Sequence, residues 1–380
     1  MNKIQKAVAI RVVLIIILLF GGHLLAKTPE KNIVNLEPEP ISNSSDASEN
    51  SSQATSQKLA RADIQAQNTA NSPKQTQIKQ TIESEKRYYL LGEPNDPYYS
   101  SSYVFSAVNA SSAWGISEDS SNVILAVLDS GFAMNHQDLS GRWYINPGES
   151  GGGKESNGFD DDGNGYVDDW RGWDFYAIEN NPQAGQENPS GSGVSHGTEV
   201  AGLAGATSNN GVGIASLARN PTIMPLQVMS DEGEGYSSDI VAAIYYAVES
   251  GADVINMSLG ASGDDPAVRN AVDYAVSNGV VVVAAAGNCG NSSQGPCSGQ
   301  PAGYVTFPAS YDRVVAVGAT TASSARASFS SYGERLDMVA PGSGSLYSTT
   351  WTSGNGTSGY KTTLHGTSYA SPIVASAAGL

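Results

Sequence analysis

Asp129, His196, Asn288 and Ser368 are the polar residues of this sequence whose types could together cleave an acyl bond. A serine hydroxyl becomes a nucleophile when a neighbouring imidazole accepts its proton, and a carboxylate can orient that imidazole. An asparagine amide can donate a hydrogen bond to the oxyanion that forms when the hydroxyl attacks a carbonyl carbon. The four residues are far apart in the sequence, so this chemistry requires a fold that brings them together.

Three histidines compete for the role of base. The chain contains four His, and His23 belongs to an apolar amino-terminal segment, which leaves His136, His196 and His365. A single histidine is more often structural than catalytic, and His136 lies in a polar turn. His196 precedes a run of mostly small residues that predicts a helix able to pack closely on a sheet. On residue types alone, the base stays open among these three.

Two apolar runs predict the strands that would carry Asp129 and Asn288. Residues 123–128 are an unbroken apolar run that ends at Asp129, and residues 280–287 form a similar run that ends at Asn288. Such runs are typical of buried parallel strands, and open α/β sheets place their sites at the carboxyl ends of the strands. The alternative for Asp129 is an ordinary turn aspartate before a Ser-Gly pair.

Ser368 is predicted to lie at the amino terminus of a helix. Small side chains follow it, and Pro372 fits near the first turn, where a missing N–H costs least. At such a terminus, free backbone N–H groups and the positive end of the helix dipole favour a developing oxyanion. Asn288, placed nearby, would supply a second donor.

Four segments, in this chain order, resemble the signature blocks of subtilisin-like serine proteases. The resemblance extends from about residue 94 to the end of the chain. The segments are Asp-Ser-Gly at 129–131, His-Gly-Thr-Glu-Val-Ala-Gly at 196–202, Ala-Ala-Gly-Asn at 285–288 and Gly-Thr-Ser-Tyr-Ala-Ser-Pro at 366–372.

The resemblance implies an α/β fold, a three-layer doubly wound sandwich with a mostly parallel central sheet, and serine endopeptidase activity on protein and peptide substrates. It implies that Asp129 orients His196, that His196 takes the proton of Ser368, and that Asn288 and the Ser368 N–H receive the oxyanion. Two other classes stay open: a non-catalytic binding protein on a protease fold, and an esterase. An esterase would use Gly-x-Ser-x-Gly, from which residues 366–370 depart at the last position only.

The resemblance also implies two extended edges that hold the substrate backbone by strand addition. The alternative is a pair of ordinary loops. Three small residues would line one wall of the primary specificity pocket, which indicates room for a large apolar or aromatic side chain. The edges are Gly233 with Gly235, and Ser258, Leu259 and Gly260; the wall residues are Ala285, Ala286 and Gly287.

Three features depart from the family pattern. Glu199 stands where a second histidine is usual, and a carboxylate close to His196 would raise the pKa of that histidine. Tyr369 stands where methionine is commonest after the nucleophile. The sequence ends at Leu380, inside the helix that Ser368 would open, so we expect a peptidase domain that is truncated at its carboxyl end.

An acidic insertion between Asp129 and His196 predicts a structural Ca²⁺ site. Its Asp-x-Asp-x-Asn-Gly-x-x-Asp pattern matches the opening of an EF-hand-type loop, but Arg171 stands where such a loop has its closing glutamate. A solvated acidic turn is the alternative. A second, weaker candidate is Asp138 with the loop at 209–211. The ligands predicted for the insertion are Asp160, Asp162, Asn164, Tyr166 and Asp168, with Asp169 as an alternative to Asp168.

The only two cysteines, Cys289 and Cys297, predict one disulfide if the chain is exported, the alternative being two free buried thiols. Export is indicated by residues 1–26, where basic residues precede the apolar run 12–20 as in a signal peptide. The alternative is an uncleaved membrane anchor, with the domain outside the cytoplasm.

Residues 27–93 are polar and lack apolar runs, so we expect a disordered linker or propeptide between the signal segment and the domain at 94–380. The whole chain carries 37 acidic and 20 basic residues, for a net charge of −17. A phosphate backbone would be repelled, which argues against a nucleic-acid partner. We expect a secreted monomer.

Overall fold

The computed structural model describes residues 93–117, 120–291, 293–352 and 359–380. The expected signal peptide at 1–26, and the expected linker at 27–93 except for its last residue, lie outside them. Among the described residues, no helix combines the length and the apolar character that crossing a bilayer requires.

The central feature is an eight-stranded sheet in which every neighbouring pair is parallel except β10 with β7. Its apolar runs make it a buried sheet, since five of the six residues of β1 are inaccessible to solvent. From edge to edge the strands are β10 (Leu364–His365), β7 (Met338–Gly344), β6 (Val315–Thr321), β5 (Val281–Ala285), β4 (Val254–Met257), β1 (Ile124–Asp129), β3 (Thr222–Gln227) and β2 (Trp173–Asp174).

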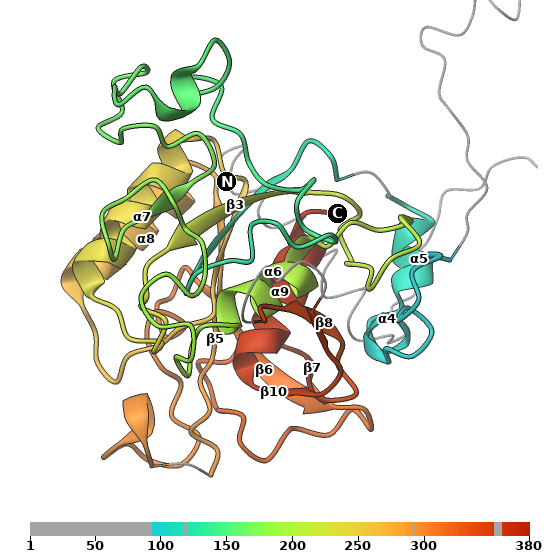
Figure 1. The fold of residues 1–380 in the computed structure, drawn as a ribbon. Helices are drawn as coiled ribbons and strands as arrows, with labels where there is room; N and C mark the ends of the chain where they lie inside the picture. Colours follow the sequence, from blue (N-terminus) through green and yellow to red (C-terminus); the bar gives the residue numbers. More distant parts are fainter. Residues whose placement is uncertain (1–92, 118–119, 292, 353–358) are drawn as a thin grey trace, which may run out of the picture. The chain divides into compact units, whose positions relative to one another are not determined.

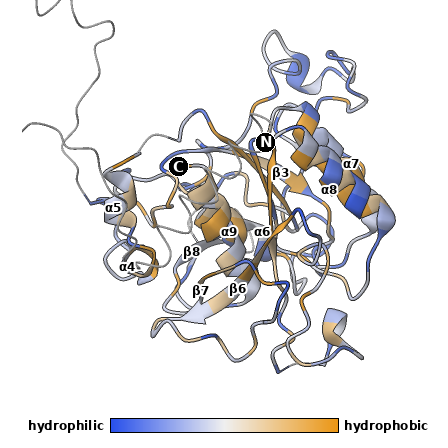
Figure 2. Ribbon diagram, turned by 180° about the vertical axis from the view of Figure 1, so that it is seen from behind, coloured by the Kyte–Doolittle hydropathy of each residue, from blue (hydrophilic) through white to orange (hydrophobic). Residues whose placement is uncertain are grey.

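Helices cover both faces of this sheet (Figure 1). Side chains of α6 (His196–Gly205) and α9 (Thr367–Ala378) share one apolar core with alternate strand residues, and those of α7 (Ser237–Glu249) and α8 (Pro266–Ser277) share the other. The strands and the core-facing sides of the helices carry most of the apolar residues (Figure 2). The arrangement is the expected three-layer α/β sandwich.

Shorter elements complete the described part of the chain. Strands β8 (Ser348–Thr350) and β9 (Gly359–Lys361) form a separate antiparallel pair, and β8 packs on α6. The remaining elements are the helices α4 (Val104–Ala107) and α5 (Ala110–Trp114) and the 3₁₀ turns η1 (Lys154–Ser156) and η2 (Gly295–Cys297).

The strand order places a crevice at the carboxyl ends of β1 and β4. From β1 the sheet continues to β3 on one side, and from β4 it continues through β5 and β6 to β7 on the other. Loops that leave two neighbouring strands in opposite directions open a crevice between them, and ligands of such sheets bind there. Asp129 ends β1 and Ser258 directly follows β4, so both lie at this point.

Candidate active site

His196 and Asp129 form a hydrogen-bonded pair at the carboxyl edge of the sheet. The Nδ1 atom of His196 lies 2.6 Å from Oδ1 of Asp129, whose side chain is 1% exposed. The carboxylate also accepts a hydrogen bond from the backbone N–H of Ser130 at 2.8 Å. Helix α6 approaches closely because residue 197 is glycine: a Cβ there would lie 2.2 Å from the carbonyl oxygen of Ser130. Close packing of α6 thus brings the imidazole to the carboxylate.

The charge of Asp129 makes His196 a stronger base than an ordinary histidine. Burial of the ring lowers the pKa of His196, but the negative charge and the hydrogen bond of Asp129 outweigh it, and the net pKa is raised. Glu199 raises the pKa of His196 further, as expected for a nearby carboxylate, and Lys361 lowers it. The imidazole is therefore suited to accepting a proton.

Ser368 is the second residue of α9, so its backbone N–H is one of the free donors of that helix end. Pro372 lies inside the helix, beyond the first turn where the sequence suggested it. A proline has no N–H for the carbonyl oxygen four residues earlier, which is that of Ser368. The Oγ of Ser258 donates to this oxygen at 2.8 Å instead. The helix tolerates the proline because Ser258, the residue after β4, supplies a hydroxyl donor in place of the missing N–H.

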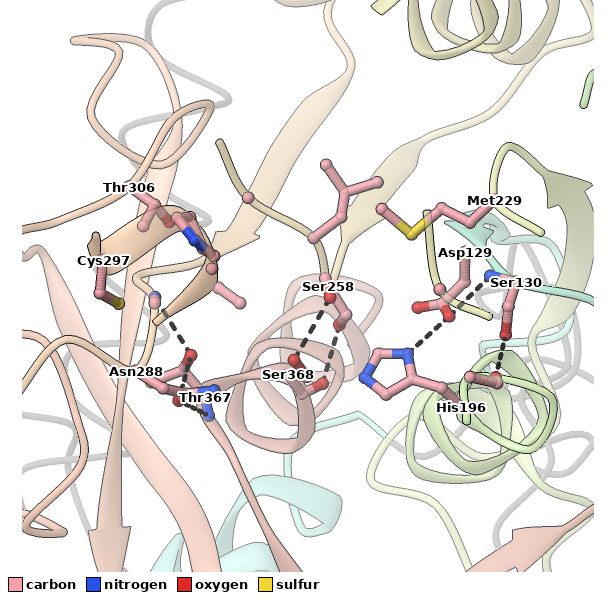
Figure 3. A pocket seen from close by; sticks show the side chains of 18 of the residues that line it. Asp129, Ser130, His196, Met229, Ser258, Asn288, Cys297, Thr306, Thr367 and Ser368 are labelled. Carbon is pink, nitrogen blue, oxygen red and sulfur yellow. Dashed lines mark hydrogen bonds and ion pairs between the residues drawn. The ribbon is translucent and has the colours of Figure 1, made fainter. Parts of the chain in front are cut away.

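The hydroxyl of Ser368 faces His196 without bonding to it (Figure 3). Its Oγ donates to the carbonyl oxygen of Ser258 at 3.3 Å, and the described residues show no hydrogen bond between Ser368 and His196. Hydrogen bonds of this kind are often long or absent before substrate binds. A rotation of the Ser368 side chain would direct its proton to the free Nε2 of the imidazole.

Asn288 lies on the opposite side of Ser368 from His196 (Figure 3). Its Oδ1 accepts hydrogen bonds from the backbone N–H and from the hydroxyl of Thr367, at 3.0 and 3.1 Å. These two bonds occupy the oxygen of the amide and leave its NH₂ group to donate. Asn288 is exposed, and the NH₂ group has no hydrogen-bond partner among the described residues. Such a donor can stabilise a negative oxygen in front of Ser368.

A cleft of about 460 Å³ contains these four residues together with most of the predicted substrate edges. Gly233, Ser258, Leu259 and Gly260 all line it. Gly235 lies instead at an adjoining cavity of about 300 Å³ that Leu259 and Gly260 also line. The two predicted edges therefore border a common groove.

The pocket wall contains Ala285 and Gly287, and Ala286 belongs to the core. Ala286 is 0% exposed and packs with the residues that face α7 and α8, so its assignment to the wall was wrong. Successive residues of a strand point to opposite faces, and β5 keeps this alternation through its end. Gly287 has φ +101°, and a Cβ there would lie 2.7 Å from Thr306, so glycine is required.

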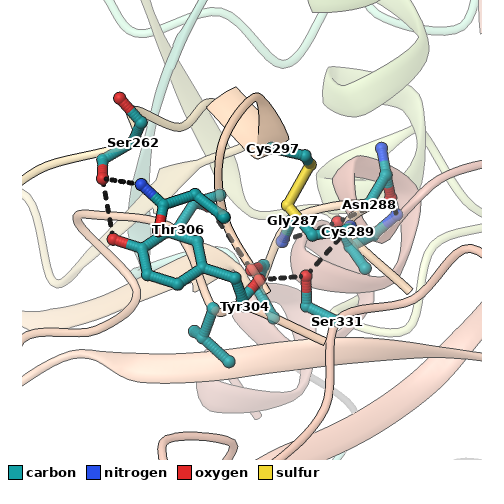
Figure 4. Close-up of a disulfide and its surroundings, with 12 residues drawn as sticks. Ser262, Gly287, Asn288, Cys289, Cys297, Tyr304, Thr306 and Ser331 are labelled. Atoms are coloured by element: carbon teal, nitrogen blue, oxygen red, sulfur yellow. Dashed lines mark hydrogen bonds between the residues drawn. A yellow bond between two sulfur atoms is a disulfide. The ribbon is translucent and has the colours of Figure 1, made fainter. Parts of the chain in front are cut away.

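Part of the cleft wall is formed by the segment 294–297. Cys289 and Cys297 are joined by a disulfide with Sγ atoms 2.02 Å apart, directly beside Asn288 (Figure 4). The N–H of Cys289 donates to Ser331 Oγ at 3.2 Å, and that hydroxyl donates to the carbonyl of Tyr304 at 2.6 Å. The disulfide thus connects the wall of the pocket to the residue after Asn288.

The other two candidate bases lie outside this cleft. His136 is 0% exposed, and its Nε2 lies 2.8 Å from the carbonyl oxygen of Gly359; burial lowers the pKa of His136. His365 is exposed on β10, where its Nδ1 lies 2.9 Å from Ser343 Oγ. Neither lines the cleft that contains Asp129 and Ser368, so the geometry favours His196 as the base.

The acidic insertion brings Asp160 and Asp162 together with Glu149, which the sequence analysis missed. Oxygen atoms of the three carboxylates lie within 4.8 Å of one another. Glu149 is 0% exposed, and its Oε2 has no hydrogen-bond partner among the described residues. A buried, unpartnered carboxylate oxygen beside two other carboxylates fits a divalent cation, since hard cations prefer oxygen ligands. The donor set is therefore consistent with Ca²⁺.

The other predicted ligands of the insertion have partners within the protein. The Asp168 carboxylate accepts the N–H groups of residues 157 and 158, at 2.9 to 3.1 Å. Asn164 accepts the N–H of Tyr166 and donates its amide to Asp169 at 2.9 Å. The Tyr166 ring packs on Trp173, with 5.1 Å between the ring centres. These residues shape the loop.

The second candidate cation site also has a member that the sequence analysis missed. Asp138 is buried and accepts hydrogen bonds from the Asn210 amide and the Ile214 N–H, at 2.7 and 2.9 Å. Burial raises the pKa of Asp138 to about 6, and the nearby Asp96 adds to this shift. Asp96 accepts the N–H of Asn209 at 2.9 Å. Two buried carboxylates therefore face one loop.

The comparisons with known proteins agree with this geometry. The Subtilase family model matches residues 120–380. The chain is 36% identical to thermitase of Thermoactinomyces vulgaris over 76% of this chain and 84% of thermitase. It is 38% identical to the thermophilic serine proteinase of a Bacillus species (strain AK1), over 76% of this chain and 59% of that protein. It is 35% identical to halolysin of Haloferax mediterranei, over 78% of this chain and 49% of halolysin. The chain belongs to the subtilase family and is a serine-type endopeptidase.

Proposed function

We propose that this chain cleaves peptide bonds in proteins by covalent catalysis at Ser368, with His196 as general base and Asp129 as its orienting carboxylate. The observation that carries the proposal is the 2.6 Å pair of His196 and Asp129 beside a serine at a helix amino terminus, in one cleft. This is the combination of nucleophile, base and orienting group that acyl transfer requires.

The mechanism begins when Ser368 Oγ turns from the Ser258 carbonyl towards His196 Nε2. The oxygen attacks the peptide carbonyl carbon while its proton passes to Nε2, and the carbonyl π electrons become the oxyanion. The Asn288 amide and the Ser368 N–H donate to this oxyanion. The imidazolium then protonates the leaving amine, the C–N bond breaks, and an acyl enzyme remains. Water, deprotonated by His196, releases the acid by the reverse steps.

Substrate would bind as an additional strand between the two glycine-containing edges. Backbone groups of Gly233 and of Ser258 to Gly260 would pair with an extended peptide, and the Ser258 carbonyl becomes available once Ser368 Oγ turns away from it. The residue before the cut would enter the pocket between Gly287 and segment 294–297. Of the residues that line this cleft, only Asp129 and His196 carry an acidic or basic side chain, and Cys297 is held in the disulfide. We therefore propose a preference for large apolar or aromatic side chains.

Calcium would have a structural role in the insertion. Glu149, Asp160 and Asp162 would hold the ion, which would neutralise carboxylates that otherwise repel one another. Asp96 and Asp138 with the 209–211 loop would form a second, weaker site. The ion would stabilise the folded chain because it binds that state in preference to the unfolded one.

The enzyme would act outside the cytoplasm, as a secreted monomer or held by an amino-terminal anchor. The apolar run at 12–20 and the acidic net charge support export, and a relative from Natrialba magadii is described as an extracellular serine protease. The acidic charge also argues against a nucleic-acid partner.

Hydrolysis of a chromogenic peptide and of the matching ester tests the proposed activity. We expect turnover of both by the parent protein and of neither by Ser368→Ala. A variant that keeps peptide turnover would refute the proposed nucleophile. Turnover of the ester alone would favour the esterase class.

A further inference from the structure

Glu199 is a buried carboxylate in the first turn of the helix that begins at His196. It is 2% exposed and has hydrogen-bond or ionic partners on three other elements. Tyr369 Oη of α9 donates to its Oε2 at 2.6 Å, Thr350 Oγ1 of β8 donates to its Oε1 at 2.9 Å, and Lys361 Nζ of β9 lies 3.1 Å from its Oε1.

Tyr369 contacts both this carboxylate and the imidazole of His196. It directly follows Ser368 in α9 and is 8% exposed. Its ring packs against the imidazole of His196, with 5.7 Å between the ring centres and 47° between the planes. The same ring therefore contacts the base and, through its hydroxyl, is fixed to the helix that carries the base.

Stability alone does not account for this network. Burying a carboxylate is costly, and well-packed apolar residues of similar volume often serve as well as a buried ion pair. Glu199 and Tyr369 are the two positions that depart from the family's signature blocks, and they are bonded to each other. Where the usual pattern has histidine and methionine, this chain therefore has a glutamate and a tyrosine that form a hydrogen bond between α6 and α9.

Some of the elements around His196 contribute charged groups and others do not. Asp129 lies on β1, Glu199 on α6 itself and Lys361 on β9, while Tyr369 of α9 contributes a phenol. Strands β3 and β8 contribute no titratable side chain. The pKa of Tyr369 is raised by burial and by Glu199, so its hydroxyl stays protonated and keeps donating.

We propose that Glu199 and Tyr369 are positioning residues that hold His196 against Ser368, and that Lys361 balances the charge of Glu199. The proposal rests on the proposed role of His196 as general base. Glu199 holds the hydroxyl of Tyr369, and the ring of Tyr369 restrains the imidazole of His196. The half-exposed Lys361 limits how far the negative charge of Glu199 increases the basicity of that imidazole.

Two charge variants should shift the acidic limb of the kcat/KM profile in opposite directions. Neutral His196 is the active form, so activity rises as pH rises through the pKa of this residue. Lys361→Met removes a positive charge and should raise that pKa, which moves the limb to higher pH. Glu199→Gln removes a negative charge and should move it to lower pH. Their controls are Arg313→Met and Asp273→Asn, an exposed ion pair near the opposite edge of the sheet.

Tyr369→Phe removes one hydroxyl and keeps the ring. We expect kcat to fall about 3- to 10-fold with KM little changed, because the hydrogen bond holds the base and does not bind substrate. A rise in KM at unchanged kcat would contradict the proposed positioning role.

A direct titration of His196 separates this proposal from the proposed mechanism. We would follow the imidazole signals of the full chain by NMR in the inactive Ser368→Ala background, assigning His196 by their loss in His196→Gln. The midpoint should rise in Lys361→Met and fall in Glu199→Gln, beyond the change in either control. Equal midpoints, or shifts in one direction, would overturn the proposal. Because Lys361 is half-exposed, we expect Lys361→Met to fold, and its midpoint tests the proposal even if Glu199→Gln does not fold. Peptidase activity that survives His196→Gln would instead refute the proposed base.

Discussion

The catalytic cleft and the acidic insertion each contain a buried carboxylate with one oxygen that has no hydrogen-bond partner among the described residues: Oδ2 of Asp129 and Oε2 of Glu149. The neighbours of the two carboxylates differ. Asp129 faces an imidazole that can carry a positive charge, whereas Glu149 faces Asp160 and Asp162. The imidazole can neutralise the first carboxylate, whereas the second has two more carboxylates beside it, whose charge a cation from solution would balance.

This difference predicts that the two regions respond to separate perturbations. Removing a side chain in the cleft should abolish chemistry and leave the fold intact. Removing cations from the insertion should lower stability and change turnover only as the fold is lost.

The largest effect is expected for Ser368→Ala, which removes the proposed nucleophile. We expect kcat on a chromogenic peptide to fall by about 10⁶, a magnitude carried over from subtilisin. Circular dichroism should be unchanged, because Ser368 is only half-buried. Ser371→Ala, in the same helix, is the matched control and should change kcat less than tenfold. Equal losses in the two variants would mean that the helix is disturbed and that Ser368 has no special role.

Asn288→Ala comes next and tests the oxyanion donor. We expect kcat to fall by about 10² to 10³ with KM little changed, a magnitude that is likewise known from subtilisin. The reason is that the amide donates only once the oxyanion has formed. The control is Asn278→Ala, an exposed residue that follows α8. An effect on KM alone would show that Asn288 binds substrate in the ground state.

Chelation should lower the melting temperature of the chain while the cleft remains competent at low temperature. A cation at a hundred times its Kd would contribute about 2.7 kcal/mol to the free energy of unfolding. We expect calcium to raise the melting temperature of the Ser368→Ala protein, which cannot cleave itself. The part of that rise due to the insertion should disappear in Asp160→Asn/Asp162→Asn.

Two variants make this calcium test specific. Asp312→Asn removes a charge from an exposed ion pair and should keep the full response. Asp96→Asn/Asp138→Asn should remove the part of the calcium-dependent rise in melting temperature that is due to the second candidate site. If the parent protein melts at the same temperature with chelator and with calcium, the insertion is an acidic turn without an ion.

The smallest effect is expected for the disulfide between Cys289 and Cys297. Reduction should lower kcat a few-fold, because the bond restrains the residue after Asn288 and the pocket wall. Closing a loop of this length is worth about 2.5 kcal/mol by the chain-entropy estimate, so Cys289→Ser/Cys297→Ser should also melt earlier. Turnover that is the same before and after reduction would show that the wall does not support the oxyanion donor.

The sequence predicts functional residues at the end of a strand or the start of a helix far better than functional residues that only the tertiary structure brings together. The positions of Asp129, Asn288 and Ser368 follow from local patterns, an apolar run or a small-residue helix, and the structure brings all three to one cleft. Glu149 precedes the calcium-like loop and carries no local signal, since only the path of the chain returns it to Asp160. Asp96 was missed for the same reason.

Two finer errors also arise because local sequence does not show tertiary packing. Ala286 and Ala285 are indistinguishable in a run of three alanines, and only the strand alternation of β5 decides which of them faces the cleft. Pro372 can lie inside α9 because Ser258, which follows β4, donates a hydrogen bond to the carbonyl oxygen that the proline leaves without a donor. Glu199 and Tyr369 were recognised as unusual, but their mutual contact depends on how α6 and α9 pack.

Labelling with a fluorophosphonate, followed by peptide mapping, tests most directly whether Ser368 is the activated nucleophile. The reagent reacts with a serine that a neighbouring base activates, so one measurement reports both activation and position. We predict a single modified residue, Ser368, with labelling lost in His196→Gln and in Ser368→Ala. Modification of another serine, or no modification of a protein that still cleaves peptides, would contradict the proposed active site.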